Sequence, residues 1–285
     1  MNKRIAAIHD LSGFGKCSLT IILPILSACG LEACPLPTAF LSSHTGGLPG
    51  FTHRDLTSDL LPAARQWSEL KLRFDGILQR FSRILGADFQ GVGNFDLLSG
   101  RDTLIFVDPC MADNGKLYKP IPPTWPAVPS CSAIKQILYC PNLTEACLLL
   151  NEPYRSERYR TREAVARLAQ DLAARFQCGV VLTGIGFSPE QTGAACLAGP
   201  GDEPAFAFSQ KVARHYHGTG DLFASVFVAA KMKGLEIGRC AQIAADFVSD
   251  TIARTVRDGT DERYGVNFEQ GIPDLISRFQ KEALL

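Results

Sequence analysis

A short segment in the last third of the chain carries the strongest chemical signal. Residues 217–226 read His-Gly-Thr-Gly-Asp-Leu-Phe-Ala-Ser-Val, a pattern that predicts a tight loop opening an apolar helix. The first-turn amides of such a helix have no partners inside the helix and point toward any nearby anion. Gly218 and Gly220 would let the backbone approach a phosphate closely. Asp221 could take a proton from an attacking hydroxyl while the amides hold charge on a transferring phosphoryl group.

An ordinary helix cap is the alternative for Gly218-Thr219-Gly220-Asp221, since an acid in the first turn also favours the helix dipole. The residues that follow favour the catalytic interpretation. Leu222 and its apolar neighbours cover nearly every face of the helix, so we expect it to be buried. A buried helix whose start carries two glycines and an acid is unusual for surface capping.

Two polar loops in the first fifty residues are candidates for binding a small molecule. The segment Asp10-Leu-Ser12-Gly-Phe-Gly-Lys follows a predicted strand, but it lacks the first glycine and the final Ser or Thr of a phosphate-binding P-loop. Asp10 and Ser12 can still offer an acceptor and a hydroxyl, or they can form a turn that caps the next helix. His44, followed by Thr45 and two glycines, could bind substrate; taken alone, it is better explained as a hydrogen-bonded loop histidine.

Acidic and polar residues follow three further predicted strands. Asp108 and Asp113 suit a site for a magnesium–nucleotide complex, with a turn rich in Asp, Asn and Gly as the alternative. The segment Asn142-Leu-Thr-Glu145 opens a helix, so Glu145 could complete a capping box, hold Mg²⁺ through water, or do both. Thr183, before a glycine at another strand end, is a weak signal by itself.

The elements that must position these residues alternate along the chain. Short apolar runs predict strands, and amphipathic or apolar stretches between them predict helices. The expected strands are Arg4–His9, Leu104–Val107, Gln136–Tyr139 and Gly179–Thr183, and the expected helices are Leu19–Cys29, Arg54–Leu70, Arg162–Phe176 and Asp221–Met232. This alternation indicates an α/β fold with a mainly parallel sheet covered on both faces. Residues 191–208 predict an antiparallel hairpin, a candidate for a small lid on one domain spanning residues 1–285.

Composition narrows the class of protein. The 285 residues carry 29 acidic and 29 Lys or Arg side chains, so no basic face for nucleic acid is expected. The N-terminus lacks a signal-peptide pattern and no apolar run has membrane-spanning length, which predicts a cytoplasmic protein without membrane contact. The ten cysteines form no CxxC pair, so we interpret them as small buried apolar residues rather than disulfides or zinc ligands.

Together these segments resemble the ribokinase-like superfamily and, within it, the pyridoxal/pyridoxamine kinases of vitamin B6 salvage. The resemblance covers nearly the whole chain. It rests on the substrate-side loops at residues 8–13 and 35–47, the Asp-Pro-Cys-Met-Ala-Asp block at residues 108–113, the Asn-x-x-Glu signature at residues 142–145, and the Gly-Thr-Gly-Asp segment at residues 218–221. It implies a three-layer sandwich with a mainly parallel central sheet, helices on both faces and a small hairpin or lid.

The resemblance also implies a role for each candidate residue. Asp221 would deprotonate the 5′-hydroxymethyl group of a B6 vitamer, which attacks the γ-phosphate of ATP. The amides of Gly218, Thr219 and Gly220 would steady the transferring group. The residues implied at the nucleotide are Asp113, Asn142, Glu145 and Thr183. Of these, Asp113, and Glu145 through water, would position Mg²⁺. Those implied at the pyridine ring are Asp10, Ser12, His44, Thr45 and Phe81. ATP and Mg²⁺ are the implied cofactors, K⁺ stays open, and a homodimer is expected by analogy.

Two departures from the family pattern keep the substrate open. Relatives usually carry a small, glycine-containing segment where this chain has Gln79-Arg80-Phe81-Ser82-Arg83, and two arginines there are unexpected. Asp10 stands where many pyridoxal kinases have serine, a pattern similar to the hydroxymethylpyrimidine kinases of thiamin synthesis. Those enzymes usually have cysteine where this chain has Asp221, which favours a B6 vitamer. A vitamer-binding protein without turnover is a further alternative, although binding alone needs no base.

Overall fold

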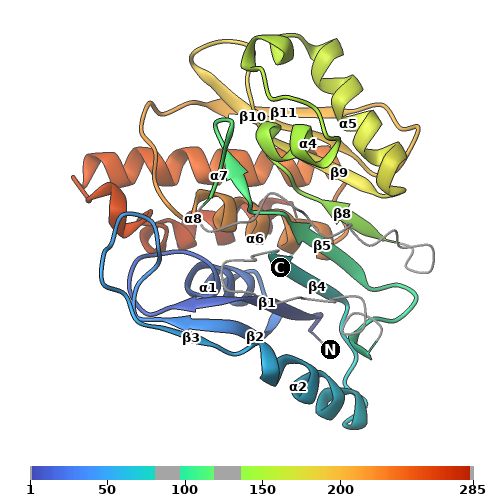
Figure 1. Cartoon of the computed structure of the whole chain (residues 1–285), viewed down its shortest axis with the longest axis vertical. Coiled ribbons are helices and arrows are strands. Elements are labelled where there is room, and N and C mark those ends of the chain that lie inside the picture. Colours follow the sequence, from blue (N-terminus) through green and yellow to red (C-terminus); the bar gives the residue numbers. More distant parts are fainter. Residues whose placement is uncertain (1, 81–96, 119–135, 283–285) are drawn as a thin grey trace.

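A long sheet forms the centre of the computed structural model, which describes residues 2–80, 97–118 and 136–282. The strands are β1 (Arg4–Ser12), β2 (Glu32–Leu41), β3 (His53–Asp55), β4 (Gly76–Arg80), β5 (Leu104–Asp108), β6 (Ala112–Asp113), β7 (Lys116–Leu117), β8 (Ile137–Tyr139), β9 (Gly179–Ile185), β10 (Gln191–Leu197) and β11 (Ala205–Gln210). Within the described residues, nine of them form one sheet in the order β11-β10-β9-β8-β5-β4-β1-β2-β3 (Figure 1). The strands from β2 to β9 in that order are parallel to one another. β3, β10 and β11 pair antiparallel at the two edges.

Helices cover both faces of the sheet. They are α1 (Leu19–Ala28), α2 (Thr57–Glu69), α4 (Leu143–Leu149), α5 (Arg162–Phe176), α6 (Thr219–Met232), α7 (Ile237–Arg257) and α8 (Ile272–Lys281), with short 3-10 turns η1 (Ser156–Tyr159), η2 (Glu262–Tyr264) and η3 (Glu269–Gly271). Because side chains alternate along a strand, Ile5 and Ala7 pack with α1, α6, α7 and α8, whereas Ala6 and Ile8 pack with α2, α4 and α5. Burial of both faces explains why the strands are continuous apolar runs.

The predicted mainly parallel α/β architecture is confirmed, with two corrections to element bounds. β1 continues through Ser12, which pairs with Leu41 after an irregularity in register, so Asp10 and Ser12 lie in the end of the strand and not in the loop after it. The predicted helix 54–70 begins only at Thr57, because Arg54 belongs to β3 and pairs with Phe40 of β2.

The predicted hairpin at residues 191–208 is also confirmed. β10 pairs antiparallel with β11, and β10 in turn pairs with β9. The hairpin therefore extends the main sheet at its edge and does not form a separate small lid. A second, two-stranded hairpin, β6–β7, follows β5 and lies beside α4 (Figure 1).

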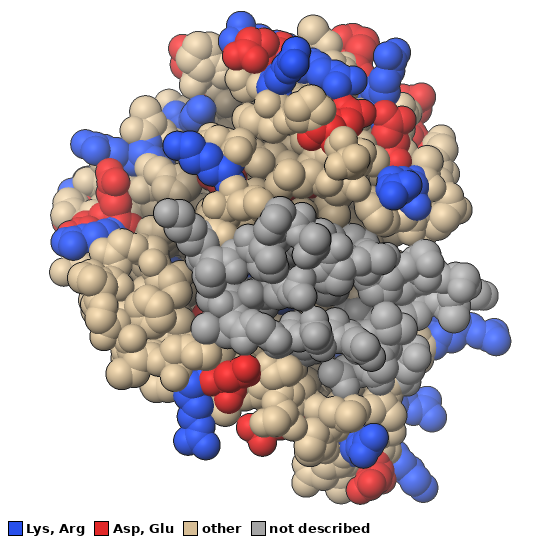
Figure 2. Space-filling model, in the orientation of Figure 1, with Lys and Arg blue, Asp and Glu red and all other residues tan. Residues whose placement is uncertain are grey.

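The structure locates the surface charges and most of the cysteines. Lys, Arg, Asp and Glu side chains are interspersed over the described part of the face in Figure 2. All cysteines in the described ranges are free, and seven of them are buried. Among the described residues, no helix has the length and apolar character needed to span a membrane.

Candidate active site

The predicted site residues gather at one edge of the sheet. The carboxyl ends of parallel strands meet there, which is where open α/β sheets bind ligands. β1 contributes Asp10 and Ser12, β5 ends at Asp108, and β9 contributes Thr183. The start of α6, with Asp221 in its first turn, packs against the loop between β1 and α1.

The start of α6 is a backbone cradle with no side-chain cap. Gly218 is the N-cap residue and adopts left-handed geometry with φ 83° and ψ −3°. A Cβ at Gly218 would lie 2.3 Å from the carbonyl oxygen of Lys16 and 2.5 Å from Cδ1 of Ile21, so only glycine fits. Among the described residues, a Cβ at Gly220 would meet no atom within 4 Å, so there is open space beside this residue in the first turn. These uncapped amides beside open space are suited to hold an anion.

Asp221 is buried in the first turn of this helix and is held by two donors. Its side chain is 3% exposed, and Oδ2 accepts a 2.9 Å hydrogen bond from the Ser18 amide. Nη1 of Arg80 lies 3.4 Å from Oδ1. Burial raises the pKa of Asp221, while the positive charge of Arg80 and the Ser18 hydrogen bond act in the opposite direction. Asp221 is therefore a desolvated carboxylate at the end of the anion cradle, as a general base would be.

Asp10 belongs to the same cluster through two serine hydroxyls. Ser18 donates to Oδ1 of Asp10 at 2.7 Å, and Ser12 donates to Oδ2 at 3.1 Å. Ser18 thus bridges Asp10 and Asp221 with its hydroxyl and its amide. The sequence analysis missed Ser18, whose only signal was its place just before α1; there its side chain caps no amide, and its φ is 51°.

His44 lies in the wall of the site with both ring nitrogens engaged. Nδ1 accepts from the Gly46 amide at 2.9 Å, so Nε2 carries the proton and donates to the Arg263 carbonyl at 2.6 Å. The ring packs on His217 with centroids 4.8 Å apart. This geometry matches the hydrogen-bonded loop histidine that the residues alone favoured. Thr45 is exposed beside it, and Phe81 lies outside the described residues.

A second cluster forms around the start of α4. Asn142 and Glu145 make the predicted capping box: the Asn142 side chain accepts from the Glu145 amide, and Oε2 of Glu145 accepts from the Asn142 amide at 2.9 Å. Oε1 of Glu145 accepts from the Met111 amide at 2.7 Å, which fastens the loop after β5. Thr183 joins the cluster through a parallel bridge to Asn142. Asn142, Glu145 and Thr183 are therefore brought together as predicted.

The carboxylates of Glu145, which is buried, and of Asp108, which is partly buried, connect the two clusters. Burial and the neighbouring charge of Asp108 raise the pKa of Glu145 to about 8. Burial also raises the pKa of Asp108 to about 6, with Asp221 adding to the shift and Arg80 opposing it. Asp108 thus lies in the electrostatic field of both clusters. It was recognised in the sequence as an acid at a strand end, but its link to Asp221 depends on tertiary structure.

The candidate magnesium residues offer few free oxygens. Both Glu145 oxygens already accept backbone amides, and both Asp113 oxygens accept from Asn114, at 2.8 and 3.0 Å. In the part of the chain that the structure describes, no three or more His, Cys, Asp and Glu side chains converge as a metal site. Mg²⁺ commonly takes one or two carboxylates together with phosphates and waters, so these two carboxylates would need phosphates and waters to complete a site.

Replacing Asn142 with alanine is expected to destabilise the protein by about 1–3 kcal/mol, because the cap of α4 and a bond to the β6 strand are lost together. Its Nδ2 donates to the Ala112 carbonyl at 2.7 Å. Urea unfolding of both proteins measures the difference. Thr161→Ala is the matched control: Thr161 caps α5 through one longer bond of 3.3 Å at an exposed site. An Asn142→Ala loss no larger than the control's would contradict this role.

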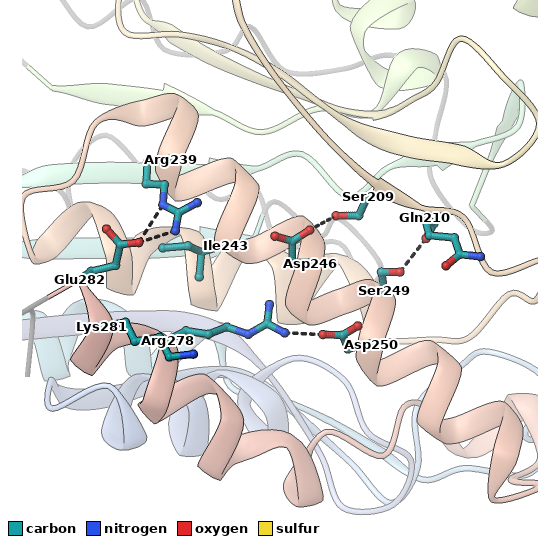
Figure 3. A pocket seen from close by; sticks show the side chains of 10 residues that line it. All are labelled: Ser209, Gln210, Arg239, Ile243, Asp246, Ser249, Asp250, Arg278, Lys281 and Glu282. Atoms are coloured by element: carbon teal, nitrogen blue, oxygen red, sulfur yellow. Dashed lines mark hydrogen bonds and ion pairs between the residues drawn. The ribbon is translucent and has the colours of Figure 1, made fainter.

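A cavity of about 530 Å³ lies away from these clusters, between α7, α8 and the end of β11 (Figure 3). None of the predicted site residues lines it. Two ion pairs, Arg239 with Glu282 and Arg278 with Asp250, connect α7 to the C-terminal helix across it. Asp246 accepts from the Ser209 hydroxyl in its wall. Because these side chains satisfy one another, the cavity is explained by helix packing.

Comparison with known proteins identifies the family. The phosphomethylpyrimidine kinase family model matches residues 127–265. A search of the curated proteins finds no match. A Bacteroides thetaiotaomicron structure, named provisionally as a phosphomethylpyrimidine kinase, is 32% identical, with a TM-score of 0.85 over 96% of this chain and 94% of that chain. An orthorhombic form under the same name, with pyridoxal, is also 32% identical, with a TM-score of 0.83 and 96% coverage of each chain.

Pyridoxal kinases share the same fold. The Lactobacillus plantarum enzyme is 26% identical, with a TM-score of 0.83 and 98% coverage of each chain. The Leishmania donovani pyridoxal kinase in complex with ADP and pyridoxamine is 16% identical, with a TM-score of 0.75 and 96% coverage of each chain, a similarity of fold alone. The chain belongs to the phosphomethylpyrimidine kinase and pyridoxal kinase family of the ribokinase-like superfamily, a family of small-molecule kinases.

Proposed function

We propose that the protein is an ATP-dependent kinase that phosphorylates the 5′-hydroxymethyl group of a B6 vitamer: pyridoxal, pyridoxamine or pyridoxine. The observation that carries the proposal is the buried Asp221 carboxylate in the first turn of a helix with no side-chain cap and with open space beside Gly220. Binding alone would need no base at this position. The pyridoxal in the Bacteroides thetaiotaomicron structure supports a B6 vitamer as acceptor.

The chain's own residues would divide the reaction between the two clusters. Asp221 takes the proton of the acceptor hydroxyl as the hydroxyl oxygen attacks the γ-phosphorus of ATP, the bond from that phosphorus to the β–γ bridging oxygen breaks, and ADP leaves. The amides of Gly218, Thr219 and Gly220 hold the negative charge of the transferring phosphoryl group. When bound, Mg²⁺ would neutralise charge on the phosphates. Asp113 would hold Mg²⁺ directly or through water, and Glu145, whose oxygens already accept amides, only through water.

The remaining predicted residues would bind the two substrates. Asn142, just beyond β8, and Thr183, in β9, are joined by a parallel bridge and would bind the nucleotide. Asp10 and Ser12 would bind the acceptor, since a carboxylate can accept from a protonated ring nitrogen or a hydroxyl. We further propose one catalytic domain over residues 1–285 that acts as a homodimer.

Hydroxymethylpyrimidine or its phosphate is the second candidate acceptor. The matched family model, the provisional name of the Bacteroides thetaiotaomicron protein and Asp10 favour it. Both candidates present a hydroxymethyl group on a nitrogen heterocycle, so the same base and anion cradle would serve either. The two differ in the number of ring nitrogens and in the exocyclic groups that Asp10 would meet.

Steady-state kinetics with four acceptors tests the proposal. Purified protein with ATP and Mg²⁺ is assayed for ADP formation with pyridoxal, pyridoxamine, pyridoxine and hydroxymethylpyrimidine. We expect the highest kcat/KM with one of the three B6 vitamers. Turnover with hydroxymethylpyrimidine alone would show that the substrate is the pyrimidine and not a B6 vitamer. Pyridoxal binding without turnover of any acceptor would favour a vitamer-binding protein.

A further inference from the structure

Arg80 places a guanidinium beside Ser18 and Asp221, where the sequence predicted no role for an arginine. It is the last residue of β4, and its side chain is 22% exposed. Nη1 donates to the Ser18 hydroxyl at 2.8 Å and lies 3.4 Å from Oδ1 of Asp221. Nη2 donates to the sulfur of Cys110. The guanidinium is thus fixed between three elements that meet at the site.

Ser18 makes this contact part of a continuous network. Its amide donates to Oδ2 of Asp221, its hydroxyl donates to Asp10, and the same hydroxyl accepts from Arg80. Ser18 is fully buried and holds a left-handed φ of 51°, a geometry that costs free energy for a residue other than glycine. The Asp221 carboxylate is therefore approached from two directions, by the loop before α1 and by the end of β4.

The charges around Asp221 show why a cation matters there. Burial raises the pKa of Asp221, and Asp10 on β1 adds to the effect, whereas Arg80 on β4 lowers it. The titratable and charged groups that interact with Asp221 from the surrounding elements are Asp10, Cys17, Arg80, Asp108 and Cys110. Cys17, Asp108 and Cys110, like Asp221 itself, can carry negative charge only at a cost in free energy, because they crowd a desolvated region.

We infer that Arg80 is a positioning residue for Asp221: with Ser18 it fixes the orientation of the carboxylate and keeps it in the charged form that a base requires. The inference rests on the proposed function for the role of Asp221 as the base. The contact itself and its effect on ionisation do not depend on that function, so the two can fail separately.

Titration of Asp221 by NMR tests the ionisation directly and without turnover. Selective ¹³Cγ-aspartate labelling gives one carboxyl signal for each aspartate, and Asp221→Asn identifies the signal of Asp221 by its loss. We expect Asp221 in Arg80→Met to titrate about 1 pH unit or more above wild type, which is a tenfold change in its proton affinity. Arg158→Met, which removes an exposed ion pair with Glu152, is the matched control and should leave the titration unchanged.

Arg80→Lys separates charge from geometry and covers the case in which Arg80→Met fails to fold. Lysine keeps the positive charge but cannot contact Ser18, Asp221 and Cys110 together. We expect Asp221 in Arg80→Lys to titrate near wild type while kcat falls at least tenfold and the acceptor KM changes little. In Arg80→Met, the acid limb of the plot of kcat against pH should move to higher pH, in the same direction as the titration of Asp221 seen by NMR.

The outcomes distinguish the inference from the proposed function. An Asp221 titration in Arg80→Met equal to or below that of wild type would overturn the inference, and so would wild-type kcat in Arg80→Lys. Absence of turnover by the wild-type protein with every acceptor would overturn the proposed function; the NMR titration would then still decide whether Arg80 controls the ionisation of Asp221.

Discussion

Asp221→Asn is expected to lower kcat by about 10²- to 10⁴-fold, the usual contribution of a general base, while pyridoxal binding changes by less than about threefold. Asparagine keeps the size of the side chain, and its oxygen can still accept from the Ser18 amide. It cannot take the proton of the acceptor hydroxyl. Initial rates at saturating ATP and pyridoxal measure kcat, and calorimetric titration with pyridoxal measures binding.

Asp246→Asn is the control for this prediction. Asp246 lies on α7 beside the cavity in Figure 3, where it accepts from Ser209 and Gln242. The control removes a carboxylate of the same type outside the proposed site, so kcat should stay within about twofold of wild type. Nearly unchanged kcat in Asp221→Asn would show that Asp221 is not the base. Loss of folding together with loss of activity would indicate a structural carboxylate.

Gly218→Ala should cost about 1–3 kcal/mol of unfolding free energy and most of the turnover. Alanine disfavours the φ of 83°, and its Cβ would lie 2.3 Å from the Lys16 carbonyl oxygen. Both effects push the start of α6 away from the loop between β1 and α1. The amides and Asp221 would then lose their alignment, so stability and kcat fall together. Urea unfolding and initial rates measure the two effects.

Gly220→Ala provides the comparison for stability. Gly220 lies in the first turn of α6, and a Cβ there would meet no atom within 4 Å. Alanine also has a higher helix propensity than glycine, so we expect equal or greater stability for this variant. Equal unfolding free energies for the Gly218 and Gly220 variants would mean that the close approach to Lys16 does not constrain this loop.

The sequence predicted β1, β5, β8, β9 and several helices because their patterns are local, but it did not predict the central strand β4. β5, β8 and β9 are buried on both faces, so each forms a continuous apolar run that predicts a strand without knowledge of its neighbours in the sheet. β2 was not predicted, since Pro35 and Pro37 are unusual in a strand. The structure accommodates both prolines because the short edge strand β3 pairs with β2 only beyond them, at residues 39–41.

Some contacts of the site were also predictable from the local sequence, and others depend on residues far apart in the chain. The capping box of Asn142 and Glu145 was predictable, because its two residues are three positions apart and meet within one turn. The link between Ser18 and Asp221 spans 203 positions, and the link between Arg80 and Asp221 spans 141. No local pattern encodes these contacts, so only the arrangement of β4, α1 and α6 reveals them.

Identification of the reaction products tests the central claim most directly. Purified protein is incubated with ATP, Mg²⁺ and pyridoxal, and the products are analysed by phosphorus-31 NMR and mass spectrometry. We predict equal amounts of ADP and pyridoxal 5′-phosphate, formed at least about 10²-fold more slowly with Asp221→Asn. ADP and inorganic phosphate without any phosphorylated acceptor, from pyridoxal or the other three candidates, would contradict the assignment of the protein as a kinase of hydroxymethyl heterocycles.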